Sequence, residues 1–213
     1  MLLSCRGNQT LMVIMIRVAV TGGIACGKSL AASVMKAAGV PVCEADSVAH
    51  ALMMPGNAVY NTVVDAFGSR ILAEDGTINR SVLGEVVFNE AVARHRLNAL
   101  VHPSVRTAIA GWLSQQEKAG EAMAVAVIPL LFEAEMAGDW NTVICVACQP
   151  SVQRERLGSR GLSETECRMR IEAQMPLAEK IERSDYTIWN DGDESMLSEA
   201  VRQVMNSIEE RYT

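Results

Sequence analysis

Five short apolar segments recur along the chain, separated by longer stretches in which apolar positions follow helical spacing. They are rich in β-branched residues or cysteine and predict strands at 16–20, 40–44, 123–128, 142–147 and 186–189. Apolar strands joined by helical stretches are typical of a parallel sheet with helices on both faces. The sequence therefore predicts an α/β fold with three layers.

Two longer intervals between these strands carry mostly helical patterns. One extends from about residue 46 to 122 and contains helix-like segments at 80–101 and 103–120. The other, at about 150–183, is rich in arginine and precedes the last strand. We predict a helical insertion in the first interval and a second helical excursion in the other.

Composition narrows the class of protein. The chain has 213 residues, 49% of them hydrophobic and 21% charged, which suits one compact domain with a smaller lobe. Its net charge of −6 argues against a general nucleic-acid binder or a membrane-surface protein, since both usually carry a basic excess. No apolar segment approaches a membrane span, and Arg6, Asn8 and Gln9 interrupt the place where a signal peptide would need an apolar core. We expect a cytoplasmic protein with reduced cysteines and a disordered extension at 1–14.

Residues 22–29 read GGIACGKS and match the pattern G-x-x-x-x-G-K-[ST]. They follow a predicted strand and open a predicted helix, which is the context that a phosphate-binding loop needs. The glycines let backbone N–H groups surround a phosphate, Lys28 reaches the β- and γ-phosphates, and Ser29 ligates Mg²⁺. A glycine-rich turn that contains Lys-Ser by chance is the weaker alternative. The motif predicts a P-loop NTPase fold that binds ATP and Mg²⁺.

Other motifs of P-loop proteins are missing. A GTPase would need N-K-x-D to read guanine, and the chain has no Asn-Lys pair. A motor-type ATPase would have an apolar strand ending in aspartate, whereas the segment MAVAVIPLLFE has Pro129 after its strand. These absences favour a small-molecule kinase.

Candidate catalytic groups follow two of the predicted strands. Asp46 comes after the second strand, and ligands bind at the carboxyl ends of parallel strands; capping a helix is an equal alternative for it. Five of the fifteen arginines fall between 154 and 170. Arg156 and Arg160 are four residues apart, on one face of a predicted helix, and two guanidinium groups there can clamp a triphosphate. The alternative is a solvated helix whose arginines pair with Glu155, Glu164 and Glu166.

Seven segments, in order and spacing, resemble those of dephospho-coenzyme A kinases, the enzymes of the last step of coenzyme A synthesis. They read TGGIACGKS, EADSVAH, VHPSVR, PLLFE, QRERLGSRG, RMRIEAQ and SDYTIWNDG, and cover about residues 16–192. The resemblance implies a nucleotide-binding core, a helical acceptor domain and a lid, which we place at 15–54 with 123–149 and 184–213, at 55–122, and at 150–183. The implied partner is the small molecule dephospho-coenzyme A, bound by a monomer or a small homo-oligomer.

The resemblance also implies a reaction, transfer of the ATP γ-phosphoryl to the ribose 3′-hydroxyl of dephospho-coenzyme A. Asp46 would orient or deprotonate that hydroxyl, or hold metal-bound water, beside Lys28 and the lid arginines Arg156 and Arg160. The implied ATP contacts are Gly23, Ala25, Cys26, Gly27, Lys28, Ser29 and Leu30, with Asn190 and Gly192 near the adenine.

On the acceptor side the resemblance points to Asp46, His102, Arg106 and Glu133. His102 precedes Pro103, so a core histidine at the start of a helix is an equal alternative. Glu133 has an alternative as well, because it could cap a following helix.

Three positions depart from the pattern common in that family. Glu44 stands where members often have Asp, which lengthens the side chain and keeps its charge. Val127 stands where many members have Asp, two residues before the proline of PLLFE. Any role of that carboxylate must be unnecessary here or filled by another group. Ser184 replaces the usual Ala, a mild change.

Cys26 lies inside the phosphate loop, where many members carry serine or another small residue. Because the loop holds phosphate through its main chain, a thiol is tolerated there. A second hypothesis is that the helix N-terminus lowers the thiol pKa, so that Cys26 is a reactive thiolate whose oxidation blocks the phosphate site. Cys145 and Cys148 form a C-x-x-C pair, but they lie in or just after a predicted strand, and we interpret them as buried apolar cysteines.

Three alternative functions remain open at the level of the sequence. The helical insertion does not by itself name the acceptor, so a kinase for another nucleoside-like or small hydroxylated molecule is possible. Val127 motivates a nucleotide-binding regulatory module without catalysis, and the C-x-x-C pair motivates a thiol redox protein. Intact Lys28, Ser29 and Asp46 favour the kinase.

Overall fold

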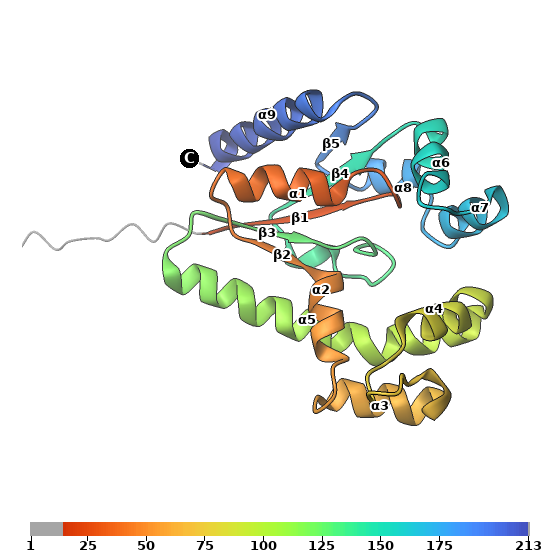
Figure 1. Ribbon diagram of the computed structural model, residues 1–213. Helices are drawn as coiled ribbons and strands as arrows, with labels where there is room; N and C mark the ends of the chain where they lie inside the picture. The colour runs from red at the N-terminus through yellow and green to blue at the C-terminus, as the bar shows by residue number, and fades with distance from the viewer. Residues whose placement is uncertain (1–14, 213) are drawn as a thin grey trace, which may run out of the picture.

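A computed structural model describes residues 15–212 of the chain (Figure 1). The extension predicted at 1–14 lies outside the described residues. Five strands form one parallel sheet in the order β2-β3-β1-β4-β5. Their bounds are β1 Ile16–Gly22, β2 Val42–Glu44, β3 Met123–Val127, β4 Thr142–Ala147 and β5 Tyr186–Trp189. All five predicted strands are confirmed, with β2 and β3 shorter and β1 longer than expected.

Helices cover both faces of this sheet. The helices α1 (Lys28–Ala37) and α9 (Glu194–Tyr212) lie on one face, and the long helix α5 (Ala91–Ala119) lies on the other (Figure 1). Alternation along β1 explains the two cores: Val18 and Val20 pack with Met35 of α1, whereas Ala19 packs toward α5. The predicted three-layer α/β arrangement is confirmed.

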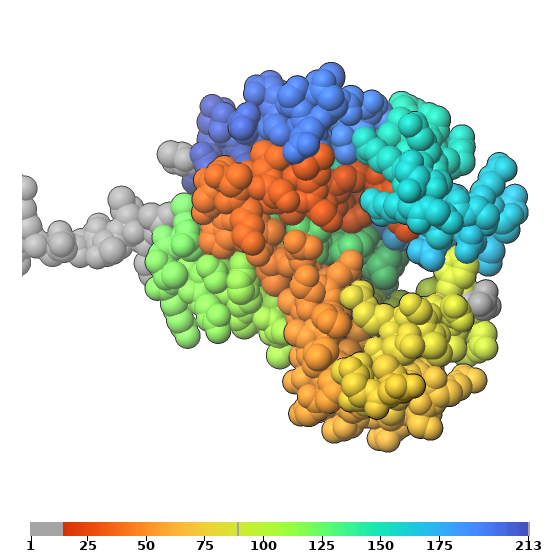
Figure 2. All heavy atoms as spheres, viewed as in Figure 1, coloured from red at the N-terminus to blue at the C-terminus, as the bar shows by residue number. Residues whose placement is uncertain are grey.

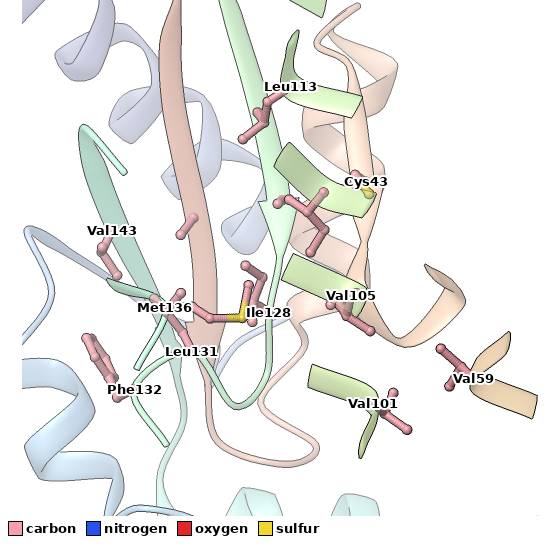
Figure 3. Close-up of a cluster of buried hydrophobic side chains, with 14 of the residues drawn as sticks. Cys43, Val59, Val101, Val105, Leu113, Ile128, Leu131, Phe132, Met136 and Val143 are labelled. Atoms are coloured by element: carbon pink, nitrogen blue, oxygen red, sulfur yellow. The ribbon is translucent and has the colours of Figure 1, made fainter. Parts of the chain in front are cut away.

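The interval between β2 and β3 is helical, as predicted. It contains α2 (Ala45–Leu52), α3 (Ala58–Phe67), α4 (Arg80–Asn89) and α5, with a 3₁₀ turn at Ser69–Ile71. The helix-like segments predicted at 80–101 and 103–120 are divided at a different place, because α4 ends at Asn89 and α5 runs through Pro103. Its buried residues Val101, Val105, Ile109 and Leu113 recur every fourth position and pack in the core that Figure 3 shows. This burial keeps the helix continuous, although proline lacks one backbone donor.

The interval between β4 and β5 folds into three short helices, α6 (Pro150–Gly158), α7 (Glu164–Glu172) and α8 (Leu177–Glu182). A second 3₁₀ turn, Ala137–Asp139, precedes β4. A cleft of about 730 Å³ separates α7 from α4, and the space-filling view shows this hollow (Figure 2). Across the cleft, the Arg170 guanidinium lies 5.2 Å from the centre of the Phe88 ring. Within residues 15–212, no helix combines the length and apolarity that crossing a membrane requires.

Candidate active site

The phosphate loop connects the end of β1 to the start of α1, and its backbone needs glycine at two positions. Gly22 has φ +138°, and a Cβ there would lie 2.0 Å from the carbonyl oxygen of Val146 on β4. Gly27 has φ +99°, and a Cβ there would lie 2.1 Å from Nδ2 of Asn190. No side chain caps the N-terminus of α1. Its first N–H groups are therefore available to an anion.

Lys28 points back over this loop. Its Nζ donates hydrogen bonds to the carbonyl oxygens of Gly22, at 3.1 Å, and Gly23, at 2.8 Å. Burial lowers the pKa of Lys28, with a further lowering from the like charge of Lys180, while Cys26 and Asp46 act in the opposite direction. A phosphate bound in the loop would supply further negative charge to balance this ammonium.

A cavity of about 570 Å³ opens above the loop. Nine of the residues predicted for catalysis or nucleotide binding line it: Ala25, Gly27, Lys28, Ser29, Leu30, Asp46, Arg156, Arg160 and Asn190. Five further residues complete the lining: Ile24, Glu44, Val127, Pro129 and Gln174. The fold thus gathers positions from 24 to 190 around one space.

Asp46 lies in the first turn of α2 and makes no capping hydrogen bond; the N-cap is Glu44. The capping alternative for Asp46 is therefore wrong. Asp46 also lines a second cavity of about 190 Å³, which it shares with His102 of α5 and with apolar side chains. Burial lowers the pKa of His102, so this imidazole is neutral at pH 7. Asp46 stands where a polar phosphate cavity meets a mostly apolar one.

The two lid arginines do not share a helix, contrary to expectation, because α6 ends at Gly158 and Arg160 follows it. Both still line the phosphate cavity. Arg156 donates to the carbonyl oxygens of Ala25, at 3.4 Å, and Asn190, at 3.0 Å. The sequence alternative paired these arginines with acidic residues, among them Glu166. The Glu166 carboxylate instead forms the capping box of α7.

Other predicted residues lie outside both cavities. The carboxylate of Glu133 accepts from Lys180 and from the backbone N–H of Met175. The capping alternative for Glu133 is wrong, because the next helical turn begins after Met136. Arg106 contacts the Glu135 carbonyl and lies 3.6 Å from Asp139.

Gly192 is the last of the predicted nucleotide contacts, and it too lies outside the cavity lining. A Cβ at this position would approach the sulfur of Met196 at 2.6 Å. Its neighbour Asn190 is buried and donates a hydrogen bond of 2.9 Å to the carbonyl oxygen of Cys26. The segment containing both residues is therefore tied to the phosphate loop through Asn190.

Two glutamines that the sequence reasoning missed hold the phosphate loop from the lid side. Gln174 Oε1 accepts from the backbone N–H of Ile24 at 3.0 Å, and Gln153 Nε2 donates to the Ile24 carbonyl at 2.7 Å. Both glutamines fall within segments that carried the family resemblance. Nothing in their spacing indicated a common partner, which lies 129 residues upstream of Gln153 and 150 residues upstream of Gln174.

Cys26 is fully buried, and its sulfur lies 3.3 Å from that of Cys148. The hydrogen bond from Cys148 lowers the pKa of Cys26 to about 7; burial opposes this shift, and Lys28 adds to it. Cys145 and Cys148 are both buried, as predicted. Burial raises the pKa of Cys145 to about 11, so the C-x-x-C pair lacks the reactive thiol that the redox alternative needs.

We expect Cys26 to be alkylated by iodoacetamide as a thiolate, with a midpoint near pH 7. Because Cys26 is fully buried and does not line the phosphate cavity, we expect the reagent to reach it only when the loop opens, and ATP should slow the reaction by holding the loop closed. Mass spectrometry of the Cys26 peptide between pH 5 and 9, roughly two units on each side of neutrality, measures both effects. Cys148→Ala is the control, because it removes the hydrogen-bond donor, and it should raise the midpoint. A wild-type midpoint equal to that of an ordinary exposed thiol would contradict the expectation.

Comparison with known proteins identifies the family. The family model for dephospho-CoA kinase matches residues 16–195. A dephospho-CoA kinase of Bdellovibrio bacteriovorus is 36% identical over 193 residues, 91% of this chain and 96% of that protein. One from Geobacillus kaustophilus is 42% identical over 176 residues, 82% and 88% of the two chains. The solved structure of dephospho-CoA kinase from Campylobacter jejuni superposes with a TM-score of 0.69 at 25% identity, covering 94% of this chain and 100% of that one.

The predicted resemblance is confirmed by these matches, and so is the P-loop kinase fold. The matched segment contains the phosphate loop, the helical insertion and the arginine-rich lid interval. The chain belongs to the dephospho-CoA kinase family, whose members phosphorylate dephospho-CoA with ATP in the last step of coenzyme A biosynthesis.

Proposed function

We propose that this chain transfers the γ-phosphoryl group of ATP to the ribose 3′-hydroxyl of dephospho-coenzyme A. The observation that carries the proposal is the position of Asp46, on the boundary between the phosphate cavity and the apolar cavity. A triphosphate held by the loop would end beside this carboxylate. An acceptor nucleoside in the apolar cavity would present its hydroxyl from the other side.

The residues around the phosphate cavity have different proposed roles in phosphoryl transfer. The N–H groups of the loop and Lys28 bind the phosphates, and Arg156 and Arg160 add positive charge from the lid side. Asp46 accepts the proton of the attacking hydroxyl or orients it. Because the transition state is loose, positioning and charge neutralisation provide most of the rate.

Mg²⁺ fits the donors of this cavity. Ser29 offers a hydroxyl oxygen, and Glu44 and Asp46 offer carboxylates. In residues 15–212, no three His, Cys, Asp or Glu side chains are grouped to hold a metal by themselves. This suits Mg²⁺, which usually takes one or two protein ligands and completes its shell with phosphate and water. When bound, the ion would neutralise charge on the transferred phosphoryl group, with Ser29 as its proposed direct ligand.

Glu44 is the group that we propose to fill the place of the missing carboxylate at position 127. The two residues are register partners on the neighbouring strands β2 and β3. Both line the phosphate cavity. The longer glutamate side chain thereby brings a negative charge next to Val127, on the same rim as Asp46.

The apolar cavity is the proposed place of the acceptor nucleoside. Ala49, Leu97, Val101 and Val105 contribute apolar surface to it, and neutral His102 contributes a hydrogen-bonding group. These side chains suit a flat heteroaromatic ring that carries polar edges. Neither cavity is lined by Arg106, Glu133 or Gly192, so direct contact of these three residues with a substrate has less support.

The division into core (15–54, 123–149 and 184–213), acceptor domain (55–122) and lid (150–183) is part of the same proposal. The helices of the last two intervals enclose the cleft between α4 and α7, which suits closure over bound substrates. We also propose that the protein acts in the cytoplasm, as a monomer or small homo-oligomer.

An acceptor competition tests the proposal. ATP and Mg²⁺ are supplied with dephospho-coenzyme A, AMP, adenosine and shikimate, first singly and then together, and kcat/KM is measured for each. We expect dephospho-coenzyme A to be preferred by at least about a hundredfold, as a site built around one acceptor allows. Tight ATP binding without transfer to any of the four acceptors would instead favour the regulatory alternative.

Arg160→Ala is expected to lower kcat about tenfold to a hundredfold and to change the KM of the acceptor by less than about twofold. The reason is that Arg160 lines only the phosphate cavity, so its charge acts on the transferred group. Arg154→Ala is the matched control, since Arg154 is an exposed arginine of the neighbouring helix α6 and lines neither cavity. An unchanged kcat for Arg160→Ala would remove this residue from the lid assignment.

A further inference from the structure

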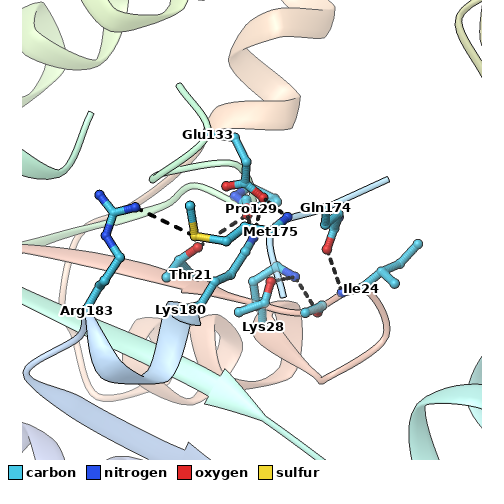
Figure 4. Close-up of polar contacts among 11 residues, drawn as sticks. Thr21, Ile24, Lys28, Pro129, Glu133, Gln174, Met175, Lys180 and Arg183 are labelled. Atoms are coloured by element: carbon cyan, nitrogen blue, oxygen red, sulfur yellow. Dashed lines mark hydrogen bonds and ion pairs between the residues drawn. The ribbon is translucent and has the colours of Figure 1, made fainter. Parts of the chain in front are cut away.

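Lys180 of α8 is fully buried, and the mechanism above does not use it. Its ammonium group makes two contacts, both with the segment that follows β3. Nζ lies 2.8 Å from Oε1 of Glu133 and 2.8 Å from the carbonyl oxygen of Pro129 (Figure 4). A residue of the lid interval thus reaches a loop of the nucleotide-binding core.

Pro129 lies in the wall between the two cavities of the site, because it lines both of them. Its carbonyl oxygen accepts a second hydrogen bond, from Oγ1 of Thr21 on β1, at 3.3 Å. Thr21 is fully buried as well. The position of this wall is therefore set by two buried donors, Lys180 and Thr21.

The same lid segment is also attached to the phosphate loop. Gln174 accepts from the N–H of Ile24 in that loop, and the next residue, Met175, donates its N–H to Glu133 at 2.9 Å. Residues 174–180 therefore connect the phosphate loop with the wall between the cavities (Figure 4).

The stability of the fold does not require a pair of charged side chains at this buried position. A buried ion pair gives a fold little more than two apolar side chains of the same volume, whereas one buried charge without its partner is strongly destabilising. Lys180 is therefore poorly explained by stability alone. Its two contacts instead give the Pro129 segment one defined position.

We propose that Lys180 is a positioning residue for phosphoryl transfer. Paired with Glu133, it donates to the Pro129 carbonyl and so fixes the position of the wall between the two cavities. At this wall the acceptor hydroxyl would meet the γ-phosphate of ATP. This inference rests on the proposed function. If this wall moved, the hydroxyl would be misaligned and water would enter, so the γ-phosphoryl group of ATP would pass to water in place of the acceptor.

The test uses Lys180→Met, Glu133→Gln and the double variant of the full chain. Each single variant should melt at a lower temperature than wild type, and the double variant should recover most of the loss because no charge is left unpaired. The discriminating readout is the ratio of ATP hydrolysed to dephospho-coenzyme A phosphorylated. In the double variant we expect kcat for transfer to fall at least about tenfold, the ratio to rise at least about fivefold, and the KM of ATP to change by less than about twofold.

Thr21→Val provides a second route that leaves every charge in place. It removes the other donor to the Pro129 carbonyl while conserving volume, and we expect a smaller rise of the same ratio. This variant decides the question if the double variant does not fold. Lys36→Met, at an exposed position of α1, is the control and should leave the ratio unchanged.

Two results would overturn the inference, and they can be told apart. A folded double variant with wild-type kcat and an unchanged ratio would mean that the pair only fills space, and the same result for Thr21→Val would mean that the hydrogen bonds to the Pro129 carbonyl do not control transfer. Wild-type protein that does not phosphorylate dephospho-coenzyme A would remove the proposed function itself, and with it the alignment that Lys180 is inferred to provide.

Discussion

Replacing Asp46 by asparagine is expected to lower kcat for phosphoryl transfer about a thousandfold, within the range that positioned general bases provide. Asparagine keeps the size and hydrogen-bonding shape of the side chain but cannot take the proton of the acceptor hydroxyl. Because the carboxylate makes no capping hydrogen bond, α2 does not depend on it for its N-terminus. We therefore expect the melting temperature and the KM of both substrates to change little.

Initial-rate measurements on purified wild type and Asp46→Asn check this result. Asp65→Asn is the matched control, since Asp65 is an exposed aspartate of α3 and lines neither cavity. Glu44→Gln is an informative comparison, because we assign Glu44 a neighbouring charge and expect a smaller loss. If Asp46→Asn keeps more than about a tenth of the wild-type kcat, the acceptor proton does not go to this carboxylate.

Replacing Lys28 by methionine is expected to lower kcat/KM for ATP about a hundredfold to a thousandfold, the usual cost of losing one preorganised group at a site of developing charge. Methionine keeps the apolar stem and removes the ammonium that faces the phosphate loop. Lys36→Met in the exposed last turn of the same helix is the control and should behave as wild type. A wild-type kcat/KM for ATP in Lys28→Met would contradict the assignment of this ammonium to the phosphates.

The same substitution should stabilise the protein when ATP is absent. The pKa of Lys28 is lowered by burial, so the folded state binds fewer protons than the unfolded state, and stability rises with pH as the unfolded lysine titrates. At pH 7 the charged lysine therefore costs the fold some stability, and Lys28→Met should melt at a higher temperature than wild type. The difference should shrink as the pH approaches the ordinary lysine pKa of 10.5. A lower melting temperature at pH 7 would contradict this electrostatic account.

Local patterns were sufficient to predict the sheet and the phosphate loop. Each strand is a short apolar segment between helical stretches, and the loop combines glycines with Lys28 and Ser29 at fixed spacing. Both features are set by neighbours in the chain, which is why their positions could be predicted to within a few residues.

Features that depend on distant partners could not be predicted in this way. The continuity of α5 through Pro103 follows from the spacing of its buried residues against the core, and that packing outweighs one missing hydrogen bond. Lys180 belongs to a charged segment that looks like an exposed helix in the sequence, yet its partners are Pro129 and Glu133. Cys26 and Cys148 are likewise brought together by the fold from positions on different elements.

The most direct test of the central claim is the position of the phosphate in the product. Wild type and Asp46→Asn are incubated with ATP, Mg²⁺ and dephospho-coenzyme A, and the product is examined by phosphorus NMR and by mass spectrometry after nuclease digestion. The account predicts a single new phosphomonoester on the ribose 3′-oxygen, formed by wild type and nearly absent with Asp46→Asn. Phosphate at another oxygen, or equal yields from the two proteins, would contradict it.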